Sequence, residues 1–129
     1  MRLLLDTHVL LWWVEDDPQL SLMARHQIAD ERNDCLVSLA TAWEMAIKAG
    51  LGKLKLAVPV QRYFQEHLSP NNFQLLPIGL EHVTLVETLP LHHRDPFDRL
   101  LAAQAIDQGC QLVTCDAAFL GFPELNLLW

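Results

Sequence analysis

The chain has 129 residues, 51% of them hydrophobic and 19% charged, which predicts one globular domain (1–129) with a sizeable core and excludes a disordered protein. Nine Lys and Arg stand against sixteen Asp and Glu, and the net charge of −7 argues against a broad basic face for nucleic acid. Three cysteines, Cys35, Cys110 and Cys115, lack the paired spacing of a zinc site or disulfide framework, and we expect buried, reduced thiols.

The first half of the chain predicts short strands that alternate with helices. The apolar run 2–6 ends at an aspartate and is typical of a strand buried on both faces. With the residues after it, the run is too short and too interrupted for a membrane span, and no signal cleavage site follows, so we expect a cytoplasmic protein. The predicted elements are a strand (2–6), two helices (7–16, 21–32), a strand (35–38) and two helices (39–50, 60–68).

The second half continues the same alternation. Gly109 ends the helix that begins at Pro96, and the last five residues are typical of an edge strand. The predicted elements are a strand (73–78), two helices (80–90, 96–108), a strand (111–116), a short helix (117–122) and a strand (125–129). Strands alternating with helices predict an α/β fold with a mainly parallel sheet and helices on both faces.

Four acidic residues from distant segments fall where such a fold places functional groups, beyond the carboxyl ends of the strands. Asp6 ends the first strand, and Asp116 ends the fourth. Glu44 lies in the second turn of the helix after the second strand, and Asp98 in the first turn of the helix at 96–108. We therefore expect these four carboxylates to converge on one cleft.

Each acid also has a structural explanation. Asp95 before Pro96 is typical of a helix N-cap, and we prefer this role for it. Asp6 and Asp116 could cap short helices, and Glu44 could pair with Lys48 on a helix surface. As a set, however, converging carboxylates repel one another unless a cation lies among them, and hard oxygen ligands suit Mg²⁺ or Mn²⁺. If these four acids bind a metal, they account for four of the chain's seven net negative charges.

Basic residues near these acids are candidates to bind the phosphates of a nucleic acid. They are Arg94, Arg99 and Lys48, and solvated surface cations are an equally supported alternative for each. The roles of three histidines, as catalytic groups or as solvated loop residues, stay open: His8, His92 and His93.

Four motifs together resemble a PIN domain and, more narrowly, the VapC-type toxins of bacterial and archaeal toxin–antitoxin pairs. They are "LLLDTHVLLW", "SLATAWEMAIKAGLGKL", "LHHRDPFDRLLAAQA" and "LVTCDAAF", and they run in the family's order over nearly the whole chain. The resemblance implies a three-layer α/β/α sandwich with a central, mainly parallel sheet of four to five strands. It also implies an endoribonuclease that uses one or two Mg²⁺ or Mn²⁺ ions to activate a water for phosphodiester hydrolysis.

The resemblance also implies residue roles. The family's acidic quartet falls on Asp6, Glu44, Asp98 and Asp116 as metal ligands and catalytic residues. Asp95 matches an additional acid whose part in metal binding is less certain. The supporting hydroxyls are those of Thr7, Thr114 and Ser38.

The partners implied are an RNA substrate, a cognate antitoxin and a second copy in a homodimer. An antitoxin would lay a helix or tail over apolar grooves near Trp12, Trp13 and the helices of 21–68, and send a basic side chain among the acids. Core packing is the alternative for both tryptophans.

Two rival functions remain. A haloacid-dehalogenase-like phosphatase also begins with a strand and an aspartate nucleophile, but it needs a second acid where this chain has His8. A non-catalytic PIN-fold binding module is the other rival, and retention of all four acids argues against it.

Overall fold

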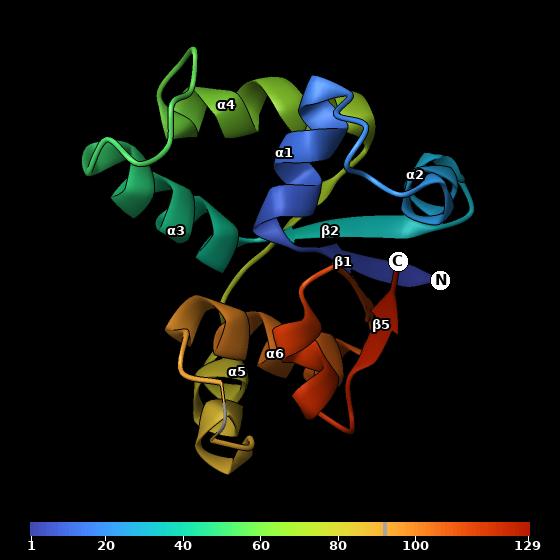
Figure 1. Cartoon of the computed structure of the whole chain (residues 1–129), viewed down its shortest axis with the longest axis vertical. Helices are drawn as coiled ribbons and strands as arrows, with labels where there is room; N and C mark the ends of the chain where they lie inside the picture. Colours follow the sequence, from blue (N-terminus) through green and yellow to red (C-terminus); the bar gives the residue numbers. More distant parts are fainter. Residues whose placement is uncertain (92) are drawn as a thin grey trace.

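Five parallel strands form one sheet in the computed structural model, which describes residues 1–91 and 93–129. The strand order is β3-β2-β1-β4-β5, and Figure 1 shows the sheet between two layers of helices. The strands are β1 (Arg2–Leu5), β2 (Asp34–Ser38), β3 (Gln74–Leu76), β4 (Gln111–Val113) and β5 (Asn126–Leu128). The predicted α/β sandwich with a parallel sheet is confirmed.

Helices cover both faces of this sheet (Figure 1). On one face lie α1 (Thr7–Glu15), α2 (Leu22–Ala29), α3 (Leu39–Gly50) and α4 (Val60–His67). On the other lie α5 (Leu80–Leu85) and α6 (Pro96–Gln108). Three short 3₁₀ helices are η1 (Ser69–Asn71), η2 (Val86–Thr88) and η3 (Ala117–Gly121). The helix predicted over 80–90 is divided into α5 and η2, and no helix within the described ranges has the length and apolar character to cross a membrane.

The alternation of side chains along β1 builds the two halves of the core. Leu3 and Leu5 point toward the layer of α1 to α4, while Leu4 points toward α6, and all three are fully buried. Burial on both faces explains why β1 is a continuous apolar run rather than an alternating one.

The pairing of β1 with β4 sets the position of the acids. Leu5 pairs with Val113, so the next residues, Asp6 and Thr114, leave the sheet side by side at its carboxyl edge. The chain continues from β1 into α1 on one face, whereas β4 follows α6 on the other, so this edge is a topological switch point. Asp116 lies three residues beyond the end of β4, further out than the predicted strand 111–116 placed it.

The three cysteines are all free thiols. Cys35 and Cys110 are buried as predicted, and burial raises the pKa of the Cys35 thiol to about 11. The prediction of burial is wrong for Cys115, which is exposed because the chain has already left the sheet there.

Candidate active site

Asp6 lies at the carboxyl end of β1 with both carboxylate oxygens held. Oδ1 accepts a 2.7 Å hydrogen bond from the backbone N–H of Thr7, which makes Asp6 the N-cap of α1. Oδ2 accepts a 2.7 Å hydrogen bond from the hydroxyl of Thr114. Burial nevertheless raises the pKa of Asp6, against the lowering effect of these two hydrogen bonds.

Glu44 enters the same region from α3. Its Oε1 accepts a 2.6 Å hydrogen bond from the hydroxyl of Thr7, and its Oε2 lies 2.9 Å from Nζ of Lys48. Glu44 is buried although Lys48 is half exposed. Because Thr7 follows Asp6 directly, this hydroxyl links the α3 acid to the acid at the end of β1.

Asp98 occupies the first turn of α6, where Asp95 is the N-cap. Asp95 Oδ1 accepts hydrogen bonds from the N–H groups of Phe97 and Asp98, which confirms the predicted capping role. Nε2 of His93 lies 2.9 Å from Oδ2 of Asp98. Burial, followed by the nearby charges of Asp95 and Asp6, raises the pKa of Asp98 to about 6, although the His93 hydrogen bond opposes the rise.

Asp116 completes the set from the segment after β4. Its Oδ1 accepts a 2.9 Å hydrogen bond from Ala118 N, so it caps η3, and the residue is exposed. Asp116 and Asp6 line one cavity of about 270 Å³, together with His8, Val9, Trp12 and Cys115.

The electrostatic effects among these groups place the acids in one region. Asp6 feels the charge of Glu44, and Asp98 feels the charge of Asp6. Lys48 feels the charges of Asp95 and Asp98 in addition to that of Glu44. Glu44 and Asp98 therefore share one nearby cation, Lys48, while Asp6 is coupled to these two acids through their charges.

The donor set fits a hard divalent ion. All of the acids offer carboxylate oxygens, and the surplus of negative charge is what such an ion offsets. No three of these acids bring their oxygens within 4.8 Å of one another, because the described residues reach that spacing only at Glu81, His82 and Asp107. In this structure the carboxylates therefore lie in one region without forming a closed cage of three ligands.

The group of Glu81, His82 and Asp107 joins α5 to α6 and is not suited to a metal. Nδ1 of His82 accepts a 3.0 Å hydrogen bond from Gly79 N, so the ring proton of the neutral imidazole is on Nε2. That nitrogen faces Oδ2 of Asp107 at 3.1 Å. The ring therefore has no lone pair directed at the two acids, and the buried His82 instead joins α5 to α6 by hydrogen bonds.

Arg99 does not bind phosphate in this arrangement, so its predicted role needs correction. Its residue exposure is only 8%, and its guanidinium is directed into the loop that precedes α6. It donates to four backbone carbonyls, those of Val86, Leu89, Pro90 and His93, at 2.5–3.4 Å. Arg99 thus fixes the loop that carries His93.

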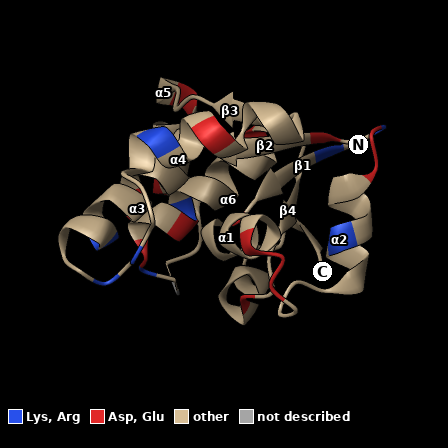
Figure 2. Cartoon of the chain, turned by 90° about the horizontal axis from the view of Figure 1, so that it is seen from above, with Lys and Arg blue, Asp and Glu red and all other residues tan. Residues whose placement is uncertain are grey.

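The other predicted residues differ in their access to the cleft. Arg94 is exposed and lines a cavity of about 360 Å³ with His93, next to the first turn of α6. Ser38 caps α3, and its hydroxyl also donates to Oε1 of Gln104, so it is turned away from the acids. His92 lies outside the described residues. In the view of Figure 2, Lys and Arg are scattered over several elements rather than gathered on one face.

Gln104 is a residue that sequence reasoning missed. It is fully buried in α6, where it accepts from Ser38 and donates a 3.2 Å hydrogen bond to the carbonyl of Pro77. The signal was present in the sequence, because a single glutamine interrupts the apolar run of this helix.

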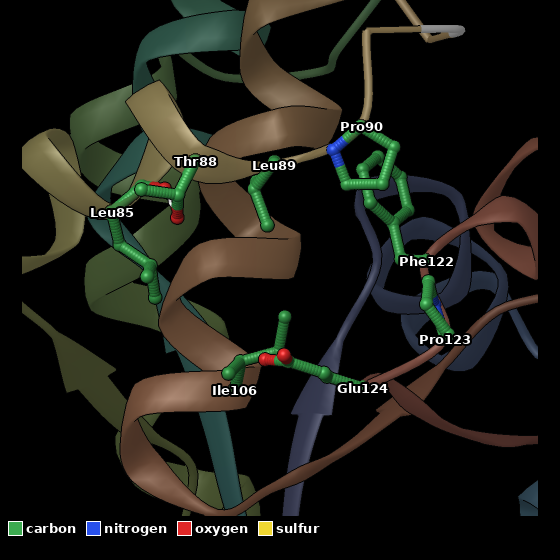
Figure 3. A pocket seen from close by; sticks show the side chains of 8 residues that line it. All are labelled: Leu85, Thr88, Leu89, Pro90, Ile106, Phe122, Pro123 and Glu124. Atoms are coloured by element: carbon green, nitrogen blue, oxygen red, sulfur yellow. Dashed lines mark hydrogen bonds between the residues drawn. The ribbon is translucent and has the colours of Figure 1, made fainter.

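A further cavity of about 190 Å³ lies between η2, α6 and the segment before β5 (Figure 3). It is mostly apolar, and Glu124 is its one carboxylate, so it does not offer a ligand set for a metal. Its lining residues are Leu85, Thr88, Leu89, Pro90, Ile106, Phe122, Pro123 and Glu124.

Comparisons with known proteins agree with this fold and with the motifs. The family model of the PIN domain matches residues 3–125. The chain is 36% identical over 118 residues to Ribonuclease VapC22 of Mycobacterium tuberculosis, covering 88% of this chain and 85% of that protein.

Two solved structures share the fold. One is VapBC2 from Rickettsia felis bound to a DNA fragment from their promoter, with a TM-score of 0.74, 20% identity, and 98% and 97% coverage of the two chains. The other is DNA-bound VapBC from Salmonella typhimurium, with a TM-score of 0.71, 15% identity, and 98% and 96% coverage. The chain belongs to the PIN domain family and is a relative of the VapC ribonucleases.

Proposed function

We propose that residues 1–129 form a single nuclease domain, an endoribonuclease that depends on Mg²⁺ or Mn²⁺ and serves as the toxin of a toxin–antitoxin pair. The observation that carries the proposal is the meeting of Asp6, Glu44 and Asp98 from three distant segments in one region, where Asp6 feels the charge of Glu44 and Asp98 feels that of Asp6. The 36% sequence identity to a ribonuclease supports RNA as the substrate. The cytoplasmic location expected from the sequence stays a prediction.

Asp6, Asp98 and Asp116 would hold one or two ions, with Glu44 as a further ligand directly or through water. When bound, such an ion supplies a Lewis acid that lowers the pKa of a water and offsets charge on the phosphate and the leaving oxygen. Asp95 has one oxygen engaged in capping α6, which leaves the other for a contact in the cleft.

The remaining residues orient these acids and the substrate. Thr7 and Thr114 donate hydrogen bonds that fix the carboxylates of Glu44 and Asp6. Lys48 and Arg94 are the cations that can reach a phosphate, because Lys48 is half exposed beside Glu44 and Arg94 is exposed beside His93. Arg99 has no place in this list because its donors are engaged.

The test is to measure binding of Mn²⁺ by calorimetry and cleavage of RNA with Mg²⁺ or with EDTA. We expect Asp98→Asn to lower both metal affinity and cleavage by at least about 100-fold, because loss of a direct ligand should cost more than loss of a group that only orients a ligand. Asp107→Asn is the matched control, because it removes a carboxylate from the other end of α6 and should leave both unchanged. Cleavage that survives EDTA and Asp98→Asn would discard the mechanism.

The same experiments separate the rival functions. A phosphatase with Asp6 as nucleophile would form a trappable aspartyl-phosphate, which a nuclease of this kind does not. A binding module without catalysis would bind RNA or protein but show no metal-dependent cleavage.

For the antitoxin, the structural neighbours supply the support, because those proteins are VapBC complexes. Leu22 and Met23 at the start of α2 are exposed apolar side chains. A cavity of about 510 Å³ lies at the other end of α2, lined by Trp13, Asp30 and Glu31 among others. An apolar helix or tail with basic residues matches this combination. The partner would be tested by co-purification with the product of the neighbouring reading frame.

For a homodimer, the exposed face of α3 is the strongest support. Leu39, Trp43, Ile47 and Leu51 recur every four residues and are exposed by 42%, 57%, 40% and 64%. The side chains of this ridge are all apolar, and Lys48, the half-exposed cation of α3, is paired with Glu44, so the ridge itself has no charge that would meet its own copy across a two-fold axis. An uncharged ridge of this kind suits a second copy of a chain whose net charge is −7.

A further inference from the structure

Three aromatic rings stand beside the acids at the carboxyl edge of the sheet. The rings of His8 and Trp12 have centroids 5.8 Å apart, and those of Trp12 and Trp129 are 6.0 Å apart. We propose that these rings, named here the ring set, form the binding surface for one unpaired nucleobase of the RNA. The inference rests on the proposed function and names the part of the substrate that this side of the cleft receives.

The fold brings the ring set to the acids. His8 and Trp12 lie one turn apart on α1, which begins directly after Asp6, so both side chains lie on one side of the helix. Trp129 follows β5, the strand that pairs with β4 ahead of Asp116. The ring set thus lies at the carboxyl edge of the sheet, with two rings on the helix after β1 and one after β5.

The cavity of about 270 Å³ joins the ring set to the acids. His8 and Trp12 line it together with Asp6 and Asp116, whereas Trp129 lies against Trp12 and is not part of the lining. His8 is exposed, Trp12 is half-buried and Trp129 is 39% exposed, so aromatic surface remains open to a ligand. A planar group that entered here would contact a ring on one side and lie next to the acids.

The chemistry of the cavity selects a base rather than a phosphate. A phosphate would lie at the ion that Asp6 and Asp116 would hold, and the ring side of the cavity has no lysine or arginine in its lining to bind another phosphate. A nucleobase is uncharged, has a flat face that stacks on indole or imidazole rings, and carries N–H donors along its edge. Stacking needs an unstacked base, so the substrate segment would be single-stranded.

The test measures binding of short single-stranded RNA, so it does not depend on cleavage. Asp98→Asn protein, in which cleavage should be strongly reduced, is titrated with an oligonucleotide of about ten nucleotides and with the same backbone lacking its bases. We expect the base-bearing strand to bind about 5- to 150-fold more tightly, the range of one base–aromatic stack. Added Trp12→Leu should abolish that difference and leave binding of the abasic strand unchanged.

His8→Ala provides a second variant, since an exposed side chain can be removed without disturbing the core, and it should reduce the same difference. His26→Ala, an exposed histidine on α2, is the matched control and should leave both affinities as they are. If folded Trp12→Leu and His8→Ala proteins still prefer the base-bearing strand as before, the proposal is overturned. The proposal is also overturned if these variants lose binding to a protein partner but not to RNA, or if the protein binds neither strand.

This outcome is separable from that of the nuclease proposal. Wild-type protein that binds bases through the ring set but cleaves no RNA would overturn the proposed catalysis and keep the stacking surface. Metal-dependent cleavage with no contribution from the ring set would overturn the stacking surface and keep the proposed catalysis.

Discussion

Thr114 donates a 2.7 Å hydrogen bond to Oδ2 of Asp6, although 108 residues separate them in the chain. The contact exists because β1 and β4 are neighbours in register, so the residues after Leu5 and Val113 leave the sheet together. The same hydroxyl accepts a 3.1 Å hydrogen bond from Asp116 N. Thr114 therefore orients one acid of the cleft and anchors the backbone of another.

Thr114→Val should weaken metal binding and RNA cleavage by about 10- to 100-fold, the usual effect of removing a group that orients a ligand. Without the hydroxyl, Asp6 loses a hydrogen bond that lowers its pKa, so protons compete more strongly for its carboxylate. Thr114→Ser keeps the hydroxyl and should retain most of both. A Thr114→Val protein that keeps full metal binding and cleavage would show that the hydrogen bond to Asp6 does not matter.

Arg99→Met should lower the free energy of unfolding by at least about 2 kcal/mol, because it leaves several loop carbonyls without their donor. The loop carries His93, so the contact between His93 and Asp98 should loosen as well. Arg62→Met is the control, since Arg62 forms an exposed pair with Glu66 one turn along α4 and should cost no more than about 0.5 kcal/mol. Urea unfolding of both variants measures the difference. A small effect at Arg99 would mean that water replaces its donors.

The elements were predictable from local patterns, but long-range partners were not. The acid after β1 and the aspartate–proline pair before α6 carry local signals, a strand end and a helix cap, and both lie where the sequence predicts. The burial of Arg99 has no such signal, because its partners are carbonyls 6 to 13 residues upstream. Every residue has a backbone carbonyl, so nothing in the sequence distinguishes this arginine from a surface cation.

The boundaries that differ also have physical reasons. The predicted strand 111–116 ends at Val113, since the side chain of Thr114 turns to Asp6 and the chain leaves the sheet toward η3. The proposed roles of the four acids remain predictions, because spacing along the chain cannot fix the distances between their oxygens.

Ile47→Glu should convert a dimer to a monomer if the exposed face of α3 joins two copies. A charge in the middle of this apolar ridge would meet its own copy across the two-fold axis, and like charges there oppose association. Sedimentation equilibrium measures the mass. Gln61→Glu adds the same charge on the exposed surface of α4 and should leave the mass unchanged. A wild-type protein that is monomeric, or an Ile47→Glu protein that stays dimeric, would remove α3 as the interface.

Asp98→Asn should stabilise the metal-free protein, and by an amount that grows with pH. The folded-state pKa of Asp98 is about 6, above its ordinary value of 3.8, so the folded state binds the proton more tightly than the unfolded state does. The contribution of Asp98 to the free energy of unfolding is therefore most favourable below 3.8, decreases as pH rises through this window, and is constant above about 6. Asparagine does not titrate, so the free energy of unfolding of Asp98→Asn protein does not show this decrease with pH.

The measurement is urea unfolding in EDTA at about pH 4, 5, 6 and 7, comparing Asp98→Asn with wild type. The stability difference should increase up to about pH 6 and then stay level. Asp30→Asn is the control with the opposite shift: hydrogen bonds from Arg32 lower the Asp30 pKa to about 2, so its titration falls below this range and its difference should be flat. Mg²⁺ should then stabilise wild type above pH 6 but not Asp98→Asn, because an ion that binds the ionised carboxylate favours the folded state. A difference that is flat for Asp98→Asn as well would mean that this carboxyl titrates in the fold as it does in the unfolded chain.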